Sequence, residues 1–218
     1  MPGLKVPSRS TLATAVLCAL ATFTVAGAQA QTVIDEWSSI KAPPPPALKS
    51  ASITDGPVTA LLIMDVNSQT CTTERRPRCA KSIPLLQKLV ADARAKGAVV
   101  IYTLSGTTTA ADILKEVAPQ QGDAVLPSFG PDKFMGNDLE KILKEKAIKT
   151  VITVGTAAHT SVLHTASGAA LRGYDVIVPV DAISSDQAYQ EQYTLLHLTT
   201  ASRVMNKVVL TTTPMMTF

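Results

Sequence analysis

Aromatic residues are scarce in this sequence, which has 1 Trp, 4 Tyr and 4 Phe among 218 residues. Proteins that bind nucleic acid use basic surfaces, often with aromatic side chains on which bases stack. This chain has no basic tract, and after residue 30 it has no apolar run of the length that a membrane span needs. We therefore expect a small-molecule substrate or ligand, no nucleic-acid partner, and no membrane association of the mature chain.

The first thirty residues have the pattern of an export signal. Lys5 and Arg9 precede an apolar run over residues 12–25. An Ala-Gln-Ala site at residues 28–30 follows, and this order is typical of a secretory signal peptide. We expect cleavage after residue 30 and an exported protein, periplasmic or secreted. A retained membrane anchor is the alternative, but the run is shorter than the ~20 residues that an anchor needs.

Cysteine is rare as well. Cys18 lies within the predicted signal, so the mature chain would keep only Cys71 and Cys79. Disulfides form and persist in oxidising compartments, and the segment between these two residues is short. The sequence predicts a Cys71–Cys79 disulfide, with two unpaired thiols as the alternative.

The chain divides into three parts. Residues 1–30 are the predicted signal, residues 31–57 form an N-terminal arm with four consecutive prolines at 43–46, and residues 58–218 form one domain. In that domain, apolar runs predict strands at 58–66, 98–104, 124–126, 149–155, 174–180 and 207–213. Helical spacing predicts helices at 80–96, 109–117, 137–147, 160–172 and 186–205. We expect Asn137 and Glu140 to form a capping box.

Strands that are apolar on both faces and alternate with helices predict a parallel sheet covered on both sides. The fold class is therefore α/β, with three layers. Ligands of such sheets bind beyond the carboxyl ends of the strands, where the strand order reverses. Asp65 ends the first strand, and it is a candidate site residue or a loop cap. Ser161 and His159 lie in the turn after the strand at 149–155, and they are candidates or ordinary helix-start and surface residues.

Three segments together resemble the isochorismatase-like hydrolases, also called the cysteine hydrolase family. They are LLIMDVN at 61–67, FGPDKFMGNDLEKIL at 129–143, and TVITVGTAAHTSVLHTASGAALRGYDVIVPVDA at 150–182. The resemblance covers residues 58–213 and implies a mostly parallel six-stranded sheet in a Rossmann-like three-layer domain, assembled as a homo-oligomer. It also implies hydrolysis of amides, such as nicotinamide and carbamoyl groups, or of the vinyl ether of isochorismate.

The family's catalytic residues carry over only in part. Its Asp matches Asp65, and the position of its nucleophilic Cys holds Ser161. Counting back from Phe134, the position of its Lys holds Ser128. Lys133 directly precedes Phe134 and is set aside by this spacing, so the sequence predicts a site without the family's lysine.

The remaining family positions concern substrate and metal. The resemblance implies a cis peptide between Thr156 and Ala157, and Asn67 stands where a Gln is frequent. We expect Asn67, Thr156, Ala157 and His159 to bind substrate. The metal-binding D-x-H of nicotinamidases is absent after residues 102–103, so we predict no metal and no other cofactor.

These residues favour a hydrolase that works without a Cys nucleophile. Asp65 would be the general acid or base, and Ser128 and Ser161 would position the substrate. A binding protein that has lost the chemistry is the main alternative, because both the Cys and the Lys are replaced. A weaker alternative makes Ser161 a nucleophile with His159 as its base.

Two further expectations concern charged residues. Arg75, Arg76 and Arg78 lie between the cysteines. If the bridge folds this loop over the cleft, one Arg could replace the missing lysine and favour an anionic substrate. A solvated basic loop is the alternative. Asp181 follows a strand and is expected to be structural.

Overall fold

The computed structural model describes Gly3 and residues 32–218. Apart from Gly3, the predicted signal peptide lies outside the described residues. The chain divides into two units, Met1–Pro43 and Pro44–Phe218, so the boundary falls within the predicted arm. The first unit contains one described helix, α1 (Val33–Glu36). Within residues 32–218, no helix is long and apolar enough to cross a membrane.

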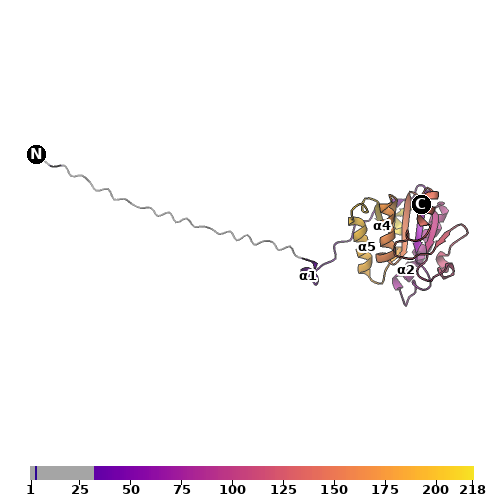
Figure 1. The fold of residues 1–218 in the computed structure, drawn as a ribbon, viewed down its shortest axis with the longest axis horizontal. Coiled ribbons are helices and arrows are strands. Elements are labelled where there is room, and N and C mark those ends of the chain that lie inside the picture. The colour runs from indigo at the N-terminus through magenta and orange to yellow at the C-terminus, as the bar shows by residue number, and fades with distance from the viewer. Residues whose placement is uncertain (1–2, 4–31) are drawn as a thin grey trace. The chain divides into compact units, whose positions relative to one another are not determined.

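The second unit alternates strands and helices (Figure 1). Its strands are β1 (Ala51–Ser52), β2 (Thr59–Met64), β3 (Val99–Thr103), β4 (Ala124–Leu126), β5 (Thr150–Thr156), β6 (Asp175–Pro179), β7 (Ile183–Ser184), β8 (Val208–Thr211) and β9 (Met216–Thr217). Its α-helices are α2 (Pro77–Ala95), α3 (Leu139–Glu145), α4 (Leu163–Leu171) and α5 (Ala188–Thr200). Shorter helical turns are η1 (Ala110–Asp112), η2 (Lys115–Val117), η3 (Ala158–Val162) and η4 (Thr213–Met215).

The main sheet has seven strands in the order β4-β3-β2-β5-β6-β8, with β7 paired to β5. Its named ladders are all parallel, which confirms the predicted fold class. The expected number of strands was six, because β7 has only two residues and gives no periodic signal. The strand order reverses between β2 and β5, so the carboxyl ends of these two strands mark the expected ligand site.

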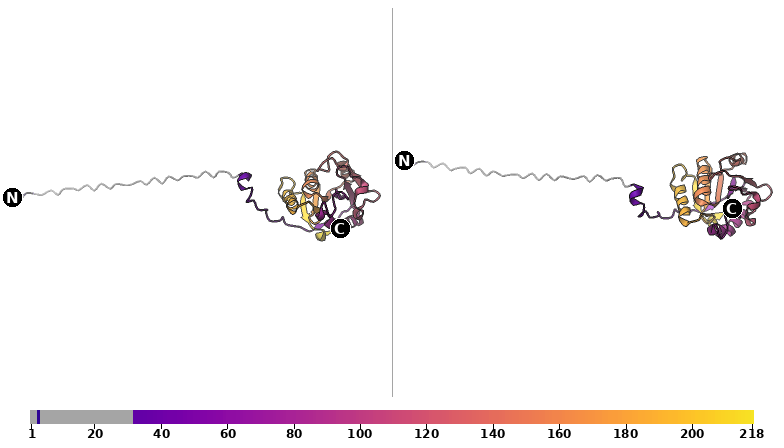
Figure 2. Two further views of the ribbon diagram at one scale, coloured as in Figure 1. Left: turned by 90° about the horizontal axis from the view of Figure 1, so that it is seen from below. Right: turned by 60° about the horizontal axis from the view of Figure 1, so that its bottom comes forward.

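Alternate residues of β2 point to opposite faces of the sheet, as the pleat requires. Leu62 and Met64 pack in the cluster that includes residues of α3, α4 and α5. Leu61 and Ile63 pack in the cluster that includes residues of α2. In both views of Figure 2, the orange and yellow helices α4 and α5 lie side by side. The sheet is therefore the middle of three layers.

Residues 44–57 of the predicted arm belong to the second unit. The backbone N–H of Lys49 donates to the carbonyl of Leu210. Strand β1 pairs in parallel with β9 near the end of the chain. The side chain of Ile53 is buried in the cluster beside α2. The last part of the predicted arm is therefore paired with the second unit through β1.

Several helix boundaries differ from the sequence prediction. Helix α2 begins at Pro77, where proline suits the first turn because it needs no N–H partner. The expected helix at 109–117 is two 3₁₀ turns. The capping box at α3 does not form, because Asp138 is the N-cap residue. Glu140 pairs instead with Lys144 and Arg172.

Candidate active site

Asp65 lies directly beyond the carboxyl end of β2 and is buried. Its backbone φ is +57°, a conformation that Asp tolerates better than most residues. Its N–H donates to the carbonyl of Thr103. The Thr103 hydroxyl donates to Asp65 Oδ1 over 3.3 Å. These contacts at the end of β3 hold the carboxylate at the point where the strand order reverses.

Lys133 supplies a cation at Asp65 that the sequence spacing does not predict. Its Nζ lies 2.8 Å from Asp65 Oδ2, and its side chain is only 2% exposed. The same Nζ donates to Ser128 Oγ over 3.0 Å. The prediction of a site without a lysine is therefore wrong. The resemblance assigns the lysine position to Ser128, whereas it is Lys133 that brings its ammonium group to the carboxylate.

The segment around Lys133 is fixed by contacts with α4 and its neighbours. The backbone N–H of Lys133 donates to Thr165 Oγ1 over 3.1 Å. The ring of Phe134 stacks on Tyr174 with centroids 6.5 Å apart, and the Arg172 guanidinium lies 4.2 Å from the Phe134 centroid. Because Lys133 is anchored on both sides, its long side chain is directed to Asp65. Counting residues back from Phe134 treats the segment as extended. It therefore does not show that the Lys133 side chain reaches Asp65.

Ser161 lies in η3, the turn between β5 and α4, and it is buried. Its hydroxyl donates to Asp65 Oδ2 over 2.7 Å. The same carboxylate oxygen therefore faces both Ser161 and Lys133. His159 is turned toward Ser185, whose Oγ lies 3.0 Å from His159 Nδ1. This geometry gives no support to His159 as the base for Ser161.

The turn after β5 completes one wall of the site. The peptide between Thr156 and Ala157 is cis, as the resemblance implies. Thr156 Oγ1 donates to the carbonyl of Ser184 over 3.0 Å. At Gly155 an added Cβ would lie 2.2 Å from the Met64 carbonyl oxygen, so only glycine allows β5 this close to β2.

A cavity of about 590 Å³ opens over these groups. It is lined by Asp65, Ser128, Lys133, Thr156, Ala157 and Ser161, together with residues 70, 75–76, 105–106, 129–131 and 160. A second cavity of about 480 Å³ lies at the amino ends of the strands and includes Thr59 and Thr150 in its lining. Only the first cavity contains the buried Asp, Lys and Ser together, so we place the chemistry there.

Two expected substrate-binding residues lie elsewhere. Asn67 is buried outside the cavity lining, and its Oδ1 accepts the backbone N–H groups of Gln69 and Thr70. It therefore shapes the turn after Asp65. His159 is also outside the lining. Neither side chain lines this cavity, so their roles as substrate ligands stay predictions. Within residues 32–218, no three His, Cys, Asp or Glu side chains converge as metal ligands.

Asp181 has the structural role that was expected. Its two carboxylate oxygens accept the backbone N–H of Thr213, over 2.9 and 3.1 Å. Asp181 Oδ2 also accepts the Thr213 hydroxyl over 2.7 Å. This carboxylate ties the segment after β6 to the segment after β8 and is absent from the cavity lining.

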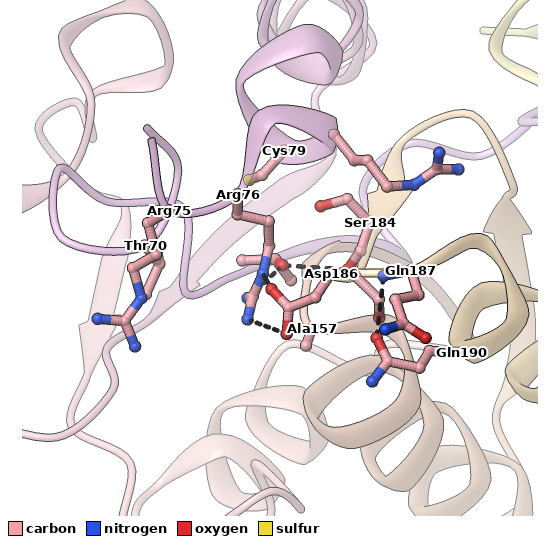
Figure 3. Close-up of polar contacts among 12 residues, drawn as sticks. Thr70, Arg75, Arg76, Cys79, Ala157, Ser184, Asp186, Gln187 and Gln190 are labelled. Atoms are coloured by element: carbon pink, nitrogen blue, oxygen red, sulfur yellow. Dashed lines mark hydrogen bonds and ion pairs between the residues drawn. The ribbon is translucent and has the colours of Figure 1, made fainter. Parts of the chain in front are cut away.

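The predicted disulfide is present. Cys71 and Cys79 are bonded with their Cα atoms 5.0 Å apart, and both side chains are buried. The bridge closes the loop that begins near Asp65 and ends in the first turn of α2. Arg76, within that loop, donates to Thr156 Oγ1 over 2.7 Å and to Asp186 over 2.8 Å. Figure 3 shows Arg76 between the loop and the segment after β7.

Arg76 and Asp186 form an ion pair at 2.8 Å. The hydrogen bond from the Arg76 guanidinium lowers the pKa of the Asp186 carboxyl below its ordinary value. Arg76 is thus engaged on two sides, whereas Arg78 pairs with Glu191 outside the cavity. Lys133 already pairs with Asp65, so no Arg is needed in place of a missing lysine, as the sequence had suggested one could be.

Replacing both cysteines with Ser should destabilise the domain by about 2–3 kcal/mol, because the bridge restricts a short loop of the unfolded chain. Urea unfolding of the double variant and of the wild type measures the difference. Free-thiol titration of the folded wild type should find Cys71 and Cys79 unreactive. Two reactive thiols in the folded protein would contradict the bridge.

The comparisons with known proteins agree with this architecture. A family model described as "Isochorismatase domain" matches residues 59–213. An isochorismatase family protein from Desulfovibrio vulgaris is similar in structure, with a TM-score of 0.65 and 21% identity over 72% of this chain and 95% of that chain. A cysteine hydrolase from Pseudomonas syringae also has a TM-score of 0.65 and 21% identity, over 78% of this chain and 94% of that one.

Two curated relatives match over shorter lengths. The secreted isochorismatase effector Isc1 of Verticillium dahliae is 33% identical over 112 residues, which cover 47% of this chain and 59% of that protein. An N-carbamoylsarcosine amidase from Arthrobacter is 31% identical over 128 residues, covering 46% of this chain and 48% of that protein. The chain thus spans about half the length of these relatives. Because the family model matches most of the chain, the protein belongs to the isochorismatase domain family.

Proposed function

We propose that this protein is an exported hydrolase of small amides, esters or enol ethers that acts without a covalent intermediate. The observation that carries the proposal is the unequal use of the Asp65 carboxylate. Oδ2 is close to both Ser161 and Lys133, at 2.7 and 2.8 Å. Among residues 32–218, Oδ1 accepts only the hydrogen bond of 3.3 Å from Thr103. Oδ1 is therefore the oxygen with capacity to exchange a proton with water or substrate.

The proposed reaction of an amide or ester uses Asp65 twice. Asp65 Oδ1 accepts a proton from water while the water oxygen bonds to the substrate carbonyl carbon. The carbon–nitrogen or carbon–oxygen bond then breaks, and the same proton passes to the leaving atom. An enol ether would instead take a proton on its vinyl carbon from the acid form of Asp65. Water would then add to the oxocarbenium carbon and return a proton to Asp65, and the resulting hemiketal would release the alcohol. Lys133 and backbone N–H groups of the 156–161 turn would stabilise the negative charge that develops on the substrate.

Ser161 has a positioning role in this proposal. A serine hydroxyl is a weaker nucleophile than a thiolate and needs a strong base nearby. Its partner, Asp65 Oδ2, is already shared with the Lys133 ammonium. We propose that Ser161 orients the carboxylate instead.

Ser161→Ala is therefore expected to reduce kcat/KM by about tenfold, the effect of losing one hydrogen bond to a charged group. Steady-state kinetics on the best substrate of an amide, ester and enol-ether panel measures it. Mass spectrometry after a phosphonate probe should find no adduct on Ser161. A stable adduct together with complete loss of turnover in Ser161→Ala would favour a covalent mechanism.

The panel also tests the binding-only alternative, which rests on Ser161 replacing a thiol. Turnover of any class that disappears on changing Asp65 would contradict that alternative. Ligand-induced stabilisation without turnover across the panel would contradict the hydrolase proposal. Export is supported by the signal-like N-terminus, the Cys71–Cys79 bridge and the description of Isc1 as secreted.

A further inference from the structure

The cavity over Asp65 has an excess of positive charge. The charged side chains in its lining are Asp65, Arg75, Arg76 and Lys133. Lys133 pairs with Asp65, and Arg76 pairs with Asp186. These pairs neutralise two of the three cations. Arg75 is left as a positive charge of the cavity that has no matching carboxylate in the lining.

Arg75 and Arg76 are neighbours in sequence, but their side chains differ in contacts and in exposure. Arg76 makes hydrogen bonds to Asp186 and Thr156, and its side chain is only 12% exposed. The Arg75 guanidinium makes no ion pair or side-chain hydrogen bond among the described residues, and Arg75 is exposed. In Figure 3, Arg75 extends on the Thr70 side of the loop without a dashed contact, whereas dashed contacts link Arg76 to Asp186.

The loop geometry holds Arg75 at the cavity. The bridge between Cys71 and Cys79 closes the loop, and the backbone N–H of Arg75 donates to Thr72 Oγ1 over 3.0 Å. The next residue, Arg76, is fixed to Thr156 at the opposite wall. The chain is therefore held in place on both sides of Arg75, which keeps this residue at the cavity.

We propose that Arg75 binds a carboxylate of the substrate, so that this protein acts on small organic anions and discriminates against their neutral analogues. A guanidinium presents parallel N–H donors that match a carboxylate in a bidentate contact. Phe129 lines the same cavity and is 80% exposed, so it offers an apolar surface for the body of such a molecule. The inference rests on the proposed function only in that substrate occupies this cavity.

Binding of two matched pairs of probes tests the inference. Isothermal titration would compare benzoate with benzamide and succinate with succinamide, using wild type, Arg75→Gln and Arg75→Lys. We expect wild type to bind at least one carboxylate about tenfold more tightly than its amide, as a charged hydrogen-bonded contact gives. Arg75→Gln should lose that preference, and Arg75→Lys should keep part of it because the charge remains but the bidentate geometry does not.

Arg78→Gln is the matched control. Arg78 belongs to the same loop, but it pairs with Glu191 and is absent from the cavity lining. This variant should bind the carboxylates as the wild type does. The inference is overturned if Arg75→Gln keeps the wild-type preference, if Arg78→Gln loses it equally, or if wild type binds neither carboxylate at millimolar concentration.

The same variants separate this inference from the hydrolase proposal. Carboxylate binding that depends on Arg75, without turnover of any substrate, would support the inference and contradict the hydrolase. Hydrolysis of neutral and anionic substrates with equal kcat/KM in wild type and Arg75→Gln would support the hydrolase proposal and contradict the inference.

Discussion

Asp65→Asn is expected to lower kcat/KM by about 10²–10⁴-fold on any substrate that the wild type hydrolyses. An amide cannot accept and return a proton as a carboxylate does, whereas its size and shape are nearly unchanged. Steady-state kinetics on purified mature protein measures the loss. Retention of more than a tenth of the wild-type activity would contradict the role of Asp65 as the acid or base.

A loss of activity must be separated from a loss of folding. Asp65→Asn leaves the buried Lys133 ammonium without its counter-charge, which is costly in the protein interior. Urea unfolding and titration of benzoate would show whether the variant is folded and retains its cavity. Asp181→Asn is the matched control, because Asp181 also follows a strand but contacts Thr213 outside the cavity. It should affect stability and leave kcat/KM close to the wild-type value.

The fold followed from hydrophobic patterning with few errors. Each strand predicted from an apolar run is present, because a buried parallel strand needs apolar residues on both faces and leaves a continuous run. The errors lie in short elements. Strand β7 has two residues, and its pairing with β5 depends on tertiary structure rather than on a local pattern. At 109–117 the apolar spacing was real, but the segment forms two short turns.

The site was predictable where a residue's place is set by the end of a strand. Asp65 and Ser161 follow β2 and β5, and parallel neighbours bring their carboxyl ends together. Asn67 and His159 are close to these residues in sequence, yet their side chains contact a turn and Ser185. Proximity in sequence does not fix which way a loop side chain points.

The prediction that the site lacks a lysine was the most consequential error, although the sequence contains a signal that points to Lys133. It is the only Lys or Arg between residues 116 and 140. A buried carboxylate needs a compensating charge, so the need for a cation at Asp65 pointed to it. The family's spacing describes only where a lysine stands in sequence. What the chemistry requires is the position of the ammonium group in space.

Lys133→Met should destabilise the domain by about 3–5 kcal/mol and remove most of the activity. Removing one partner of a buried ion pair leaves the other charge uncompensated, and this costs more than the pair itself contributes. Both side chains are almost wholly buried, at 2% and 6% exposed. Urea unfolding measures the first effect and steady-state kinetics the second. Lys144→Met is the control, because its ion pair with Glu140 is on the surface and contributes little.

A double-mutant cycle tests whether the loss arises from the pairing with Asp65. Asp65→Asn combined with Lys133→Met removes both charges, so its destabilisation should be smaller than the sum of the single changes. Additive effects would contradict the ion pair.

Moving the lysine with Lys133→Ser and Ser128→Lys is a stricter test. Ser128 Oγ lies 3.0 Å from Lys133 Nζ, so a lysine at position 128 starts beside the same carboxylate. It should restore part of the stability lost in Lys133→Met, because the charge at Asp65 matters and the residue number does not.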